Sequence, residues 1–331
     1  MDRFNVVILA AGKGERMMSK KPKVLHEIMG KPMIGYVIER AKELKPENIS
    51  VVVGFGREKV IPLLSNYNVD FSIQGEQKGT AHAVLCAENA LKGGDLLVLY
   101  GDVPLMDTST LMDFIDFYRE KRTITFMTTS VNDPSGYGRV IMEGEDIKAI
   151  IEDADATSEQ KKINEINTGI CIIPEGHLRL LREIKDDNRK GEYYLTDICR
   201  VAEENKIKVR GFHYPVSSHV LGINSRKELL EANVIMRDRI NQLHLRNGVT
   251  FIDKNVYIDS DVVIGMDTVL YPDTYIMGRT MIGSDVIVGP NTVIKNSIIH
   301  SHVILKGFAS IEGVEVEEGN VVEAFEKRVK A

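Results

Sequence analysis

A six-residue repeat in the C-terminal part of the chain constrains its fold most strongly. Large aliphatic residues recur at every sixth position after Gly248, and a Thr or Val stands two positions before each. The aliphatic positions are Ile252, Ile258, Ile264, Leu270, Ile276, Ile282, Val288 and Ile294. Such a period is typical of a parallel β-helix, in which stacked coils bury a continuous core. Ordinary hairpins would not keep this register over the whole stretch.

The strict six-residue register breaks near Asn296, and past Gly319 we expect a final helix. Asn320 could cap a final helix, with Glu323 at its third position and an apolar face. That face would comprise Val321, Val322, Phe325 and Val329. We therefore predict a short β-helix domain over 248–331 whose open end is closed by a C-terminal helix, since an uncovered sheet edge invites aggregation.

The first two thirds of the chain alternate short apolar runs with amphipathic stretches. Phe4–Leu9, Ile49–Val53 and Leu96–Tyr100 are expected to be buried strands, and Met33–Leu44 a helix. Continuous aliphatic strands separated by helices favour an α/β, Rossmann-like domain with a mostly parallel sheet covered on both faces. We place this domain at 1–225 and a connecting helix at 226–247.

Charge and cysteine content exclude several classes of function. The net charge of −6 argues against nonspecific nucleic-acid binding. Three widely spaced cysteines form no disulfide framework or familiar zinc pattern. There is no apolar run of membrane-spanning length and no signal peptide, so we expect no membrane partner and a cytoplasmic protein.

A basic, glycine-containing loop follows the first expected strand. Gly12 and Gly14 would let backbone N–H groups approach phosphates, and Arg16 and Lys23 could neutralise them. A plain strand-to-helix turn also needs glycines, so these residues alone are weak evidence. Asp102 follows the strand that ends at Tyr100, and ligands of parallel sheets bind at that edge.

The segment Leu9–Met17 with Lys23 resembles the signature of the sugar-1-phosphate nucleotidylyltransferases. Further segments are similar to the bacterial N-acetylglucosamine-1-phosphate uridylyltransferases of the GlmU type. They lie in family order at 74–83, 100–105, 136–139, 151–152, 165–170, 191–197 and 222–226. The hexapeptide region extends the match, and in this family the β-helix is left-handed.

The resemblance implies a set of site residues. It assigns the nucleotide to Leu9, Ala10, Ala11, Gly12, Lys23, Gln74, Gly79, Thr80, Tyr100, Gly101 and Asp102. It assigns the amino sugar to Gly138, Glu152 and Asn167, with Tyr194 and Thr196 near its phosphate. Arg16 and Lys23 would be catalytic, and Asp102 and Asn224 would bind Mg²⁺.

The implied reaction joins UTP to N-acetylglucosamine-1-phosphate, giving UDP-N-acetylglucosamine, a cell-wall precursor, and pyrophosphate. Side-by-side association of β-helices in this family implies a homotrimer. Two departures stand out. Glu15 replaces a usual Thr or Ser in the phosphate loop, so we expect its carboxylate to turn outward, toward Lys13 or Arg16. Glu312 stands where bifunctional relatives carry a phosphate-binding Arg, so we expect no acetyltransferase activity.

Two other functions stay open on this evidence. The chain could act on a different sugar-1-phosphate or nucleoside triphosphate. It could also be a noncatalytic regulatory subunit of the same fold, although Lys23, Asp102 and Asn224, which such subunits tend to lose, are all present. His82 is expected to be structural, and His300 and His302 to lie on a solvated face rather than in a metal site.

Overall fold

The computed structural model describes residues 3–330, and the chain divides into two units. The first comprises Met1–His26 and Met33–Arg226, and the second Glu27–Pro32 and Lys227–Ala331. The main division thus falls one residue from the expected end of the first domain at 225. The sequence did not indicate that the short segment Glu27–Pro32 belongs to the second unit.

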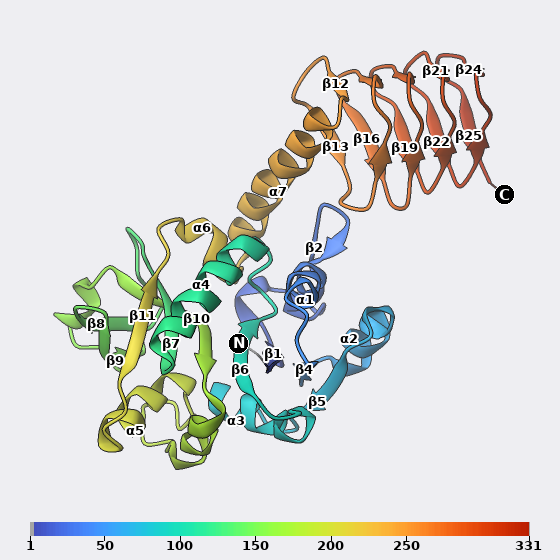
Figure 1. Ribbon diagram of the computed structural model, residues 1–331. Helices are drawn as coiled ribbons and strands as arrows, with labels where there is room; N and C mark the ends of the chain where they lie inside the picture. The colour runs from blue at the N-terminus through green and yellow to red at the C-terminus, as the bar shows by residue number, and fades with distance from the viewer. Residues whose placement is uncertain (1–2, 331) are drawn as a thin grey trace. The chain divides into compact units, whose positions relative to one another are not determined.

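A nine-stranded sheet with the order β5-β4-β1-β6-β10-β7-β11-β9-β8 forms the centre of the first unit (Figure 1). The strands are β1 Phe4–Ala10, β4 Asn48–Val53, β5 Asp70–Ile73, β6 Asp95–Tyr100, β7 Ile124–Ser130, β8 Arg139–Glu143, β9 Asp146–Ile151, β10 Glu165–Ile173 and β11 Val209–His213. Strands β5, β4, β1 and β6 are parallel, whereas β10 runs antiparallel to both β6 and β7. The expected Rossmann-like α/β domain is present, but its sheet is mixed, because an apolar run does not specify strand direction.

Helices cover both faces of this sheet, which explains why its central strands are apolar throughout. Along β1, Val6 and Ile8 pack into one core and Val7 and Leu9 into the other. Residues of α1, α2 and α4 complete the first core, and residues of α3 and α5 the second. These helices are α1 Met33–Glu43, α2 Arg57–Leu64, α3 Thr80–Cys86, α4 Thr108–Lys121 and α5 Ile198–Glu204, and α6 Ser217–Val220 follows.

The second unit contains the long helix α7, Arg226–Arg246, and a small hairpin. Strands β2 (Glu27–Ile28) and β3 (Lys31–Pro32) form that hairpin. Its tip is held by α7 and by the first coil of the β-helix. The Met29 N–H donates to Asn233 Oδ1 at 3.1 Å, and the Met29 carbonyl accepts from the Ser260 N–H at 2.9 Å.

Within residues 3–330, no helix combines the length and apolarity needed to cross a bilayer.

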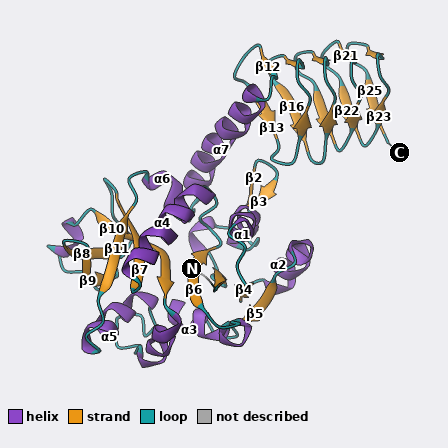
Figure 2. Ribbon diagram, in the orientation of Figure 1, coloured by secondary structure: helices purple, strands orange, loops and turns teal. Residues whose placement is uncertain are grey.

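Three parallel sheets form the β-helix, consistent with the left-handed type (Figure 2). Their orders are β12-β15-β18-β21-β24, β13-β16-β19-β22-β25 and β14-β17-β20-β23. The strands are β12 Thr250–Phe251, β13 Val256–Ile258, β14 Val263–Ile264, β15 Val269–Leu270, β16 Thr274–Met277, β17 Met281–Ile282, β18 Ile287–Val288, β19 Val293–Lys295, β20 Ile298–Ile299, β21 Ile304–Leu305, β22 Ser310–Glu312, β23 Glu315–Val316, β24 Val321–Val322 and β25 Lys327–Val329.

The repeat fills the core as expected, with one exception. The aliphatic positions from Ile258 to Ile294 are all buried, but Ile252 is exposed because Phe251 pairs with Leu270 in its place. The buried Thr residues of the repeat satisfy their hydroxyls locally: Thr274 Oγ1 donates to the Tyr271 carbonyl at 2.7 Å, and Thr292 Oγ1 to the Gly289 carbonyl at 2.8 Å. Threonine therefore fits these core positions as well as valine does.

The prediction of a C-terminal helix is wrong, because the β-helix continues. Val321–Val322 forms β24 and Lys327–Val329 forms β25, each paired in parallel with the coil before it. The register change near Asn296 is real but small: Val269 pairs with Ile287, eighteen residues on, whereas Ile287 pairs with Ile304, seventeen residues on. Val322 continues the buried column of Leu305, so the spacing that suggested a helix belongs to a seventeen-residue coil.

Candidate active site

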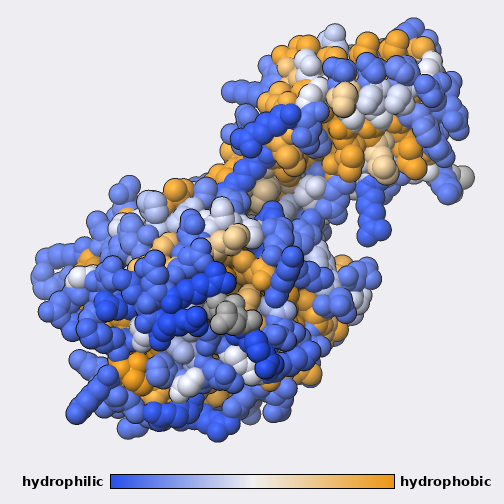
Figure 3. All heavy atoms as spheres, in the orientation of Figure 1, coloured by the Kyte–Doolittle hydropathy of each residue, from blue (hydrophilic) through white to orange (hydrophobic). Residues whose placement is uncertain are grey.

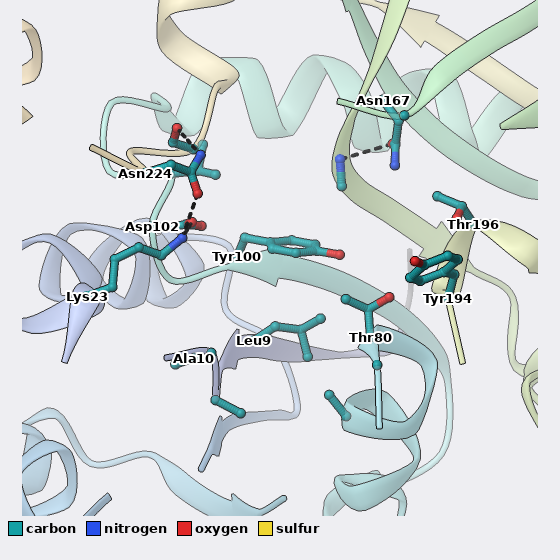
Figure 4. Close-up of a pocket in the computed structure, with 18 of the residues that line it drawn as sticks. Leu9, Ala10, Lys23, Thr80, Tyr100, Asp102, Asn167, Tyr194, Thr196 and Asn224 are labelled. Carbon is teal, nitrogen blue, oxygen red and sulfur yellow. Dashed lines mark hydrogen bonds and ion pairs between the residues drawn. The ribbon is translucent and has the colours of Figure 1, made fainter. Parts of the chain in front are cut away.

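A cavity of about 460 Å³ opens at the carboxyl ends of β1 and β6, within the first unit. Figure 4 shows side chains from several elements directed into it. Leu9 and Ala10 end β1, Tyr100 ends β6, Asn167 lies on β10 and Thr80 begins α3. This is the edge where open α/β sheets bind ligands, and the volume suits a small organic molecule.

Nearly all residues that the sequence singled out line this cavity. They are Leu9, Ala10, Ala11, Gly12, Arg16, Lys23, Gln74, Gly79, Thr80, Tyr100, Asp102, Gly138, Glu152, Asn167, Tyr194, Thr196 and Asn224. Gly101 is the exception: a Cβ there would meet the side chains of Ile34 and Val24, at 3.2 and 3.3 Å, so this glycine serves packing beneath the site. The roles of the lining residues remain predictions.

The glycine loop turns its acidic residue away from the cavity. Glu15 is exposed, lies outside the lining and accepts from Lys13 Nζ at 3.2 Å, which confirms the expected outward turn. Gly14 adopts a left-handed conformation, and a Cβ there would lie 2.6 Å from Cβ of Lys23. The loop therefore passes close over Lys23 and leaves Arg16 lining the cavity.

Lys23, Asp102 and Asn224 meet at one end of the cavity (Figure 4). Lys23 Nζ donates to Asp102 Oδ2 and, at 2.9 Å, to Asn224 Oδ1. The orientation of the Asn224 amide, with Oδ1 toward Lys23, is fixed because its Nδ2 donates to the Gly222 carbonyl at 2.9 Å. Gly222 lies close beneath this group, and a Cβ there would lie 3.2 Å from Asp102 Oδ2.

This end of the cavity suits a hard divalent cation. The Asp102 carboxylate and the Asn224 amide oxygen already converge on one positive charge, the Lys23 ammonium. Such oxygens are the ligands that Mg²⁺ prefers, and Mg²⁺ typically takes one or two protein ligands with waters and substrate phosphates completing its shell. Among residues 3–330, no group of three or more His, Cys, Asp or Glu forms a richer metal cage.

Another part of the cavity wall is built from the segment that leads into α3. Gln74, directly after β5, is buried, and its Nε2 donates to the Gly79 carbonyl at 3.0 Å. Gly79 has φ +107°, and a Cβ there would lie 2.5 Å from the Tyr193 carbonyl oxygen. Thr80 Oγ1 accepts from the Leu195 N–H at 2.8 Å. Sequence reasoning missed Gln77, which lines the site and donates to the Ala11 carbonyl at 2.6 Å.

A third group of side chains presents polar atoms from the residue after β9, from β10 and from the short 3-10 helix Leu195–Asp197 before α5. Burial raises the pKa of Glu152, opposed by a hydrogen bond of 3.0 Å from Thr196 Oγ1. Asn167 Oδ1 accepts from the Gly169 N–H at 3.0 Å, and the Asn167 N–H donates to the Gly138 carbonyl at 2.8 Å. Carboxylate, amide and hydroxyl groups of this kind suit the hydroxyls of a sugar.

Tyr194 is buried and lines the cavity, yet no described group hydrogen-bonds to its hydroxyl. Burial raises its pKa, and Glu192 and Glu152 nearby add to the effect, so the phenol stays protonated and able to donate. Buried hydroxyls are rarely left without a partner, so this one is a donor in the wall of the cavity that no described residue uses.

Fold and site together define a nucleotidyltransferase class of protein. A glycine loop with Arg16 and Lys23 lies at the carboxyl edge of the sheet, and a hexapeptide β-helix follows. The family model of the MobA-like NTP transferase domain matches residues 6–191, and that of the bacterial transferase hexapeptide, comprising six repeats, matches 261–296. The chain therefore belongs to the MobA-like NTP transferase family.

The chain is similar in sequence to curated relatives that are named as bifunctional proteins. The protein is 42% identical over 252 residues to "Bifunctional protein GlmU" of Clostridium botulinum (strain Loch Maree / Type A3), covering 75% of this chain and 55% of that one. It is 42% identical over 257 residues to the protein of that name from Thermoanaerobacter pseudethanolicus, covering 76% and 56%. The chain thus spans about half the length of these relatives.

A solved structure supports the fold of the first unit. UDP-glucose pyrophosphorylase complexed with UDP-glucose aligns with a TM-score of 0.56 at 21% identity, over 72% of this chain and 99% of that one. The identity is low, so this likeness concerns the fold alone.

Proposed function

We propose that this protein is a Mg²⁺-dependent uridylyltransferase that converts UTP and N-acetylglucosamine-1-phosphate to UDP-N-acetylglucosamine and pyrophosphate. The observation that carries the proposal is the convergence of Lys23, Asp102 and Asn224 in a cavity that also holds Gln74 and Thr80. The 42% identity to GlmU proteins supports the choice of substrates.

The reaction follows from the charges in the cavity. A phosphate oxygen of the sugar-1-phosphate attacks the α-phosphorus of UTP, a new P–O bond forms, and the bond to the β-phosphate breaks to release pyrophosphate. The attacking oxygen is already anionic, so no general base is needed. Lys23 and Arg16 lower the repulsion between the two anions and hold them in line. Asp102 and Asn224 would hold Mg²⁺, which would supply additional charge neutralisation when bound.

Asp102→Asn tests the proposal, because it keeps volume and an acceptor for Lys23 but removes one negative charge. We expect turnover to fall about 10²- to 10³-fold. The melting temperature should also fall, because the mostly buried Lys23 ammonium loses its charged partner. Asp116→Asn, in an exposed ion pair with Arg119, is the matched control and should retain full activity. Pyrophosphate release from UTP with several sugar phosphates is the assay. Undiminished activity in Asp102→Asn or in EDTA would remove the metal assignment.

A homotrimer through the β-helix is also part of the proposal. Two of the three sheets carry outward columns of aliphatic residues and Met: Val263, Met281 and Ile298 on one, and Ile287, Ile304 and Val321 on the other. The outward column of the third sheet begins with Tyr257, Tyr275 and Val293 and ends with Ser310 and Lys327. Figure 3 shows apolar atoms gathered on the visible side of this unit. In a three-fold ring each copy uses one face toward each neighbour, so two different apolar faces are what such closure requires.

Acetyl transfer, the second activity of bifunctional family members, is proposed to be absent. Glu312 occupies the position that the resemblance assigns to a phosphate-binding Arg, and its carboxylate accepts from Lys295 Nζ of the preceding coil at 2.9 Å. A carboxylate here repels a sugar phosphate. Incubation with acetyl-CoA and glucosamine-1-phosphate should release no enzyme-dependent free thiol; release at a rate near that of uridylyl transfer would contradict this.

A further inference from the structure

A chain of side chains behind the cavity fixes the orientation of the Gln74 amide. Both Nε2 hydrogens of Gln74 have acceptors: the Gly79 carbonyl at 3.0 Å and His82 Nδ1 at 3.1 Å. A carbonyl oxygen can only accept, so the contact with Gly79 identifies the nitrogen end of the amide. The oxygen end, Oε1, has no donor among the residues that the structure describes and belongs to a side chain that lines the cavity.

The same contacts determine the tautomer of His82. Since Gln74 Nε2 donates to it, Nδ1 must be the unprotonated nitrogen of a neutral ring, and the proton sits on Nε2. Cys86 lies one helical turn further along α3, and its Sγ is 3.8 Å from His82 Nε2. The sulfur can accept a weak hydrogen bond from the Nε2–H group. Burial raises the pKa of the Cys86 thiol, so the sulfur stays uncharged.

We propose that His82 is a positioning residue that sets base selectivity by holding Gln74 Oε1 toward the cavity as a hydrogen-bond acceptor. This inference rests on the proposed function, in which Gln74 faces the nucleotide base. An acceptor at this place complements the N3–H of uracil. It opposes cytosine, whose N3 presents a lone pair to the same oxygen.

His82 acts on the amide together with Gly79. The carbonyl of Gly79 accepts one hydrogen and opposes a half turn, which would bring Oε1 against that carbonyl oxygen. The His82 contact adds to this restraint and limits rocking of the amide. Rotation by a half turn would present the NH₂ group to the base, which favours cytosine over uracil. Losing the His82 acceptor therefore weakens discrimination between two bases rather than binding of nucleotides in general.

The test compares kcat/KM for UTP and CTP in three variants. His82→Phe keeps a ring without an acceptor, and His82→Leu is a smaller variant that excludes overpacking as the cause. In both, the ratio of UTP to CTP should fall about tenfold or more, the scale of one lost hydrogen bond in a buried site. His82→Asn places an amide oxygen near the position of Nδ1 and should restore most of the ratio.

The outcomes separate this inference from the proposed function. An equal loss for UTP and CTP in His82→Phe and His82→Leu, or a loss in His82→Asn as large as in His82→Leu, would overturn the positioning role while leaving uridylyl transfer intact. A wild-type preference for CTP over UTP would overturn the uridylyl assignment itself, and with it the acceptor role of Gln74.

Discussion

At the scale of single residues, a substitution at Tyr194 can distinguish an effect on substrate binding from an effect on protein stability, because the Tyr194 hydroxyl has no partner among the described residues. Tyr194→Phe removes a group that makes no hydrogen bond to the described residues, so the free energy of unfolding should change by less than about 1 kcal/mol. If the sugar phosphate is the partner, its KM should rise roughly tenfold with little change in the KM of UTP. Thr196→Val, which removes a hydroxyl bonded to Glu152, is the contrasting variant and should lose stability.

Glu152 makes a prediction about pH. Burial raises its pKa in the folded protein, so the folded state favours the protonated carboxyl. Its contribution to stability is therefore fully present below the unfolded pKa and is lost as pH rises through the folded pKa. Glu152→Gln mimics the protonated form at every pH. It should be more stable than wild type at pH 8, and the difference should shrink as pH falls toward 4.5.

Urea unfolding of both proteins at several pH values measures that difference directly. Asp197, whose pKa burial also raises, is present in both proteins, and its charge adds to the raised pKa of Glu152, so the measured difference includes the interaction between these two carboxyls. If the difference in free energy of unfolding between the two proteins grew as the pH fell, the predicted direction of the Glu152 effect would be wrong. Sugar binding should be weaker in Glu152→Gln even where the protein is more stable, because a neutral amide replaces a charge-assisted acceptor.

The sequence predicted those site residues that lie in recognisable motifs. It did not predict residues that act through contacts with other side chains. The Gly12–Lys23 loop and Asp102 each follow an apolar strand, and that order along the chain is enough to place them at one sheet edge. The contacts of Gln77 with Ala11 and of His82 with Gln74 join residues whose spacing has no recognisable period. Nothing in the sequence distinguished His82 from an ordinary core histidine.

At the scale of elements, the start of α3 depends on one glycine. Gly79 combines a φ of +107° with an approach to the Tyr193 backbone that leaves no room for a Cβ. Gly79→Ala should therefore destabilise the protein by roughly 2–4 kcal/mol, from backbone strain plus the clash. Gly75→Ala, four residues earlier, meets no atom within 4 Å and is the matched control, expected within about 0.5 kcal/mol of wild type. Similar melting temperatures for the two variants would contradict the strain argument.

Helices and strands whose apolar residues recur with a clear period could be predicted from the sequence. Elements whose place depends on contacts with other parts of the chain could not. The expected helix at Met33–Leu44 and the strand at Phe4–Leu9 each match the observed element to within one residue. The hairpin Glu27–Pro32 has no period of its own and is defined by contacts with α7 and the β-helix. The last coil was mistaken for a helix because Val321, Val322 and Phe325 fit a helical face as well as a coil of seventeen residues.

At the scale of the whole molecule, the proposed trimer makes the two apolar faces of the β-helix interdependent. Each interface would pair the Met281 column of one copy with the Ile287 column of the next, so a charge on either face affects all three interfaces. Met281 and Ile287 are 54% and 40% exposed in the single chain, so replacing either by Glu should leave the coil folded. A dimer through one face would instead respond to only one of the two substitutions.

Sedimentation equilibrium at micromolar concentration distinguishes these assemblies. Wild type should show three times the mass of one chain, and Met281→Glu and Ile287→Glu should each shift the protein toward monomer. Ser310→Glu adds the same charge to the third sheet, where the outward column passes from Val293 to Ser310 and Lys327, and should remain trimeric. A wild-type protein that sediments only as a monomer would contradict the trimer. Dissociation by Met281→Glu but not by Ile287→Glu would replace it with a two-fold dimer, because only a heterologous ring requires both faces.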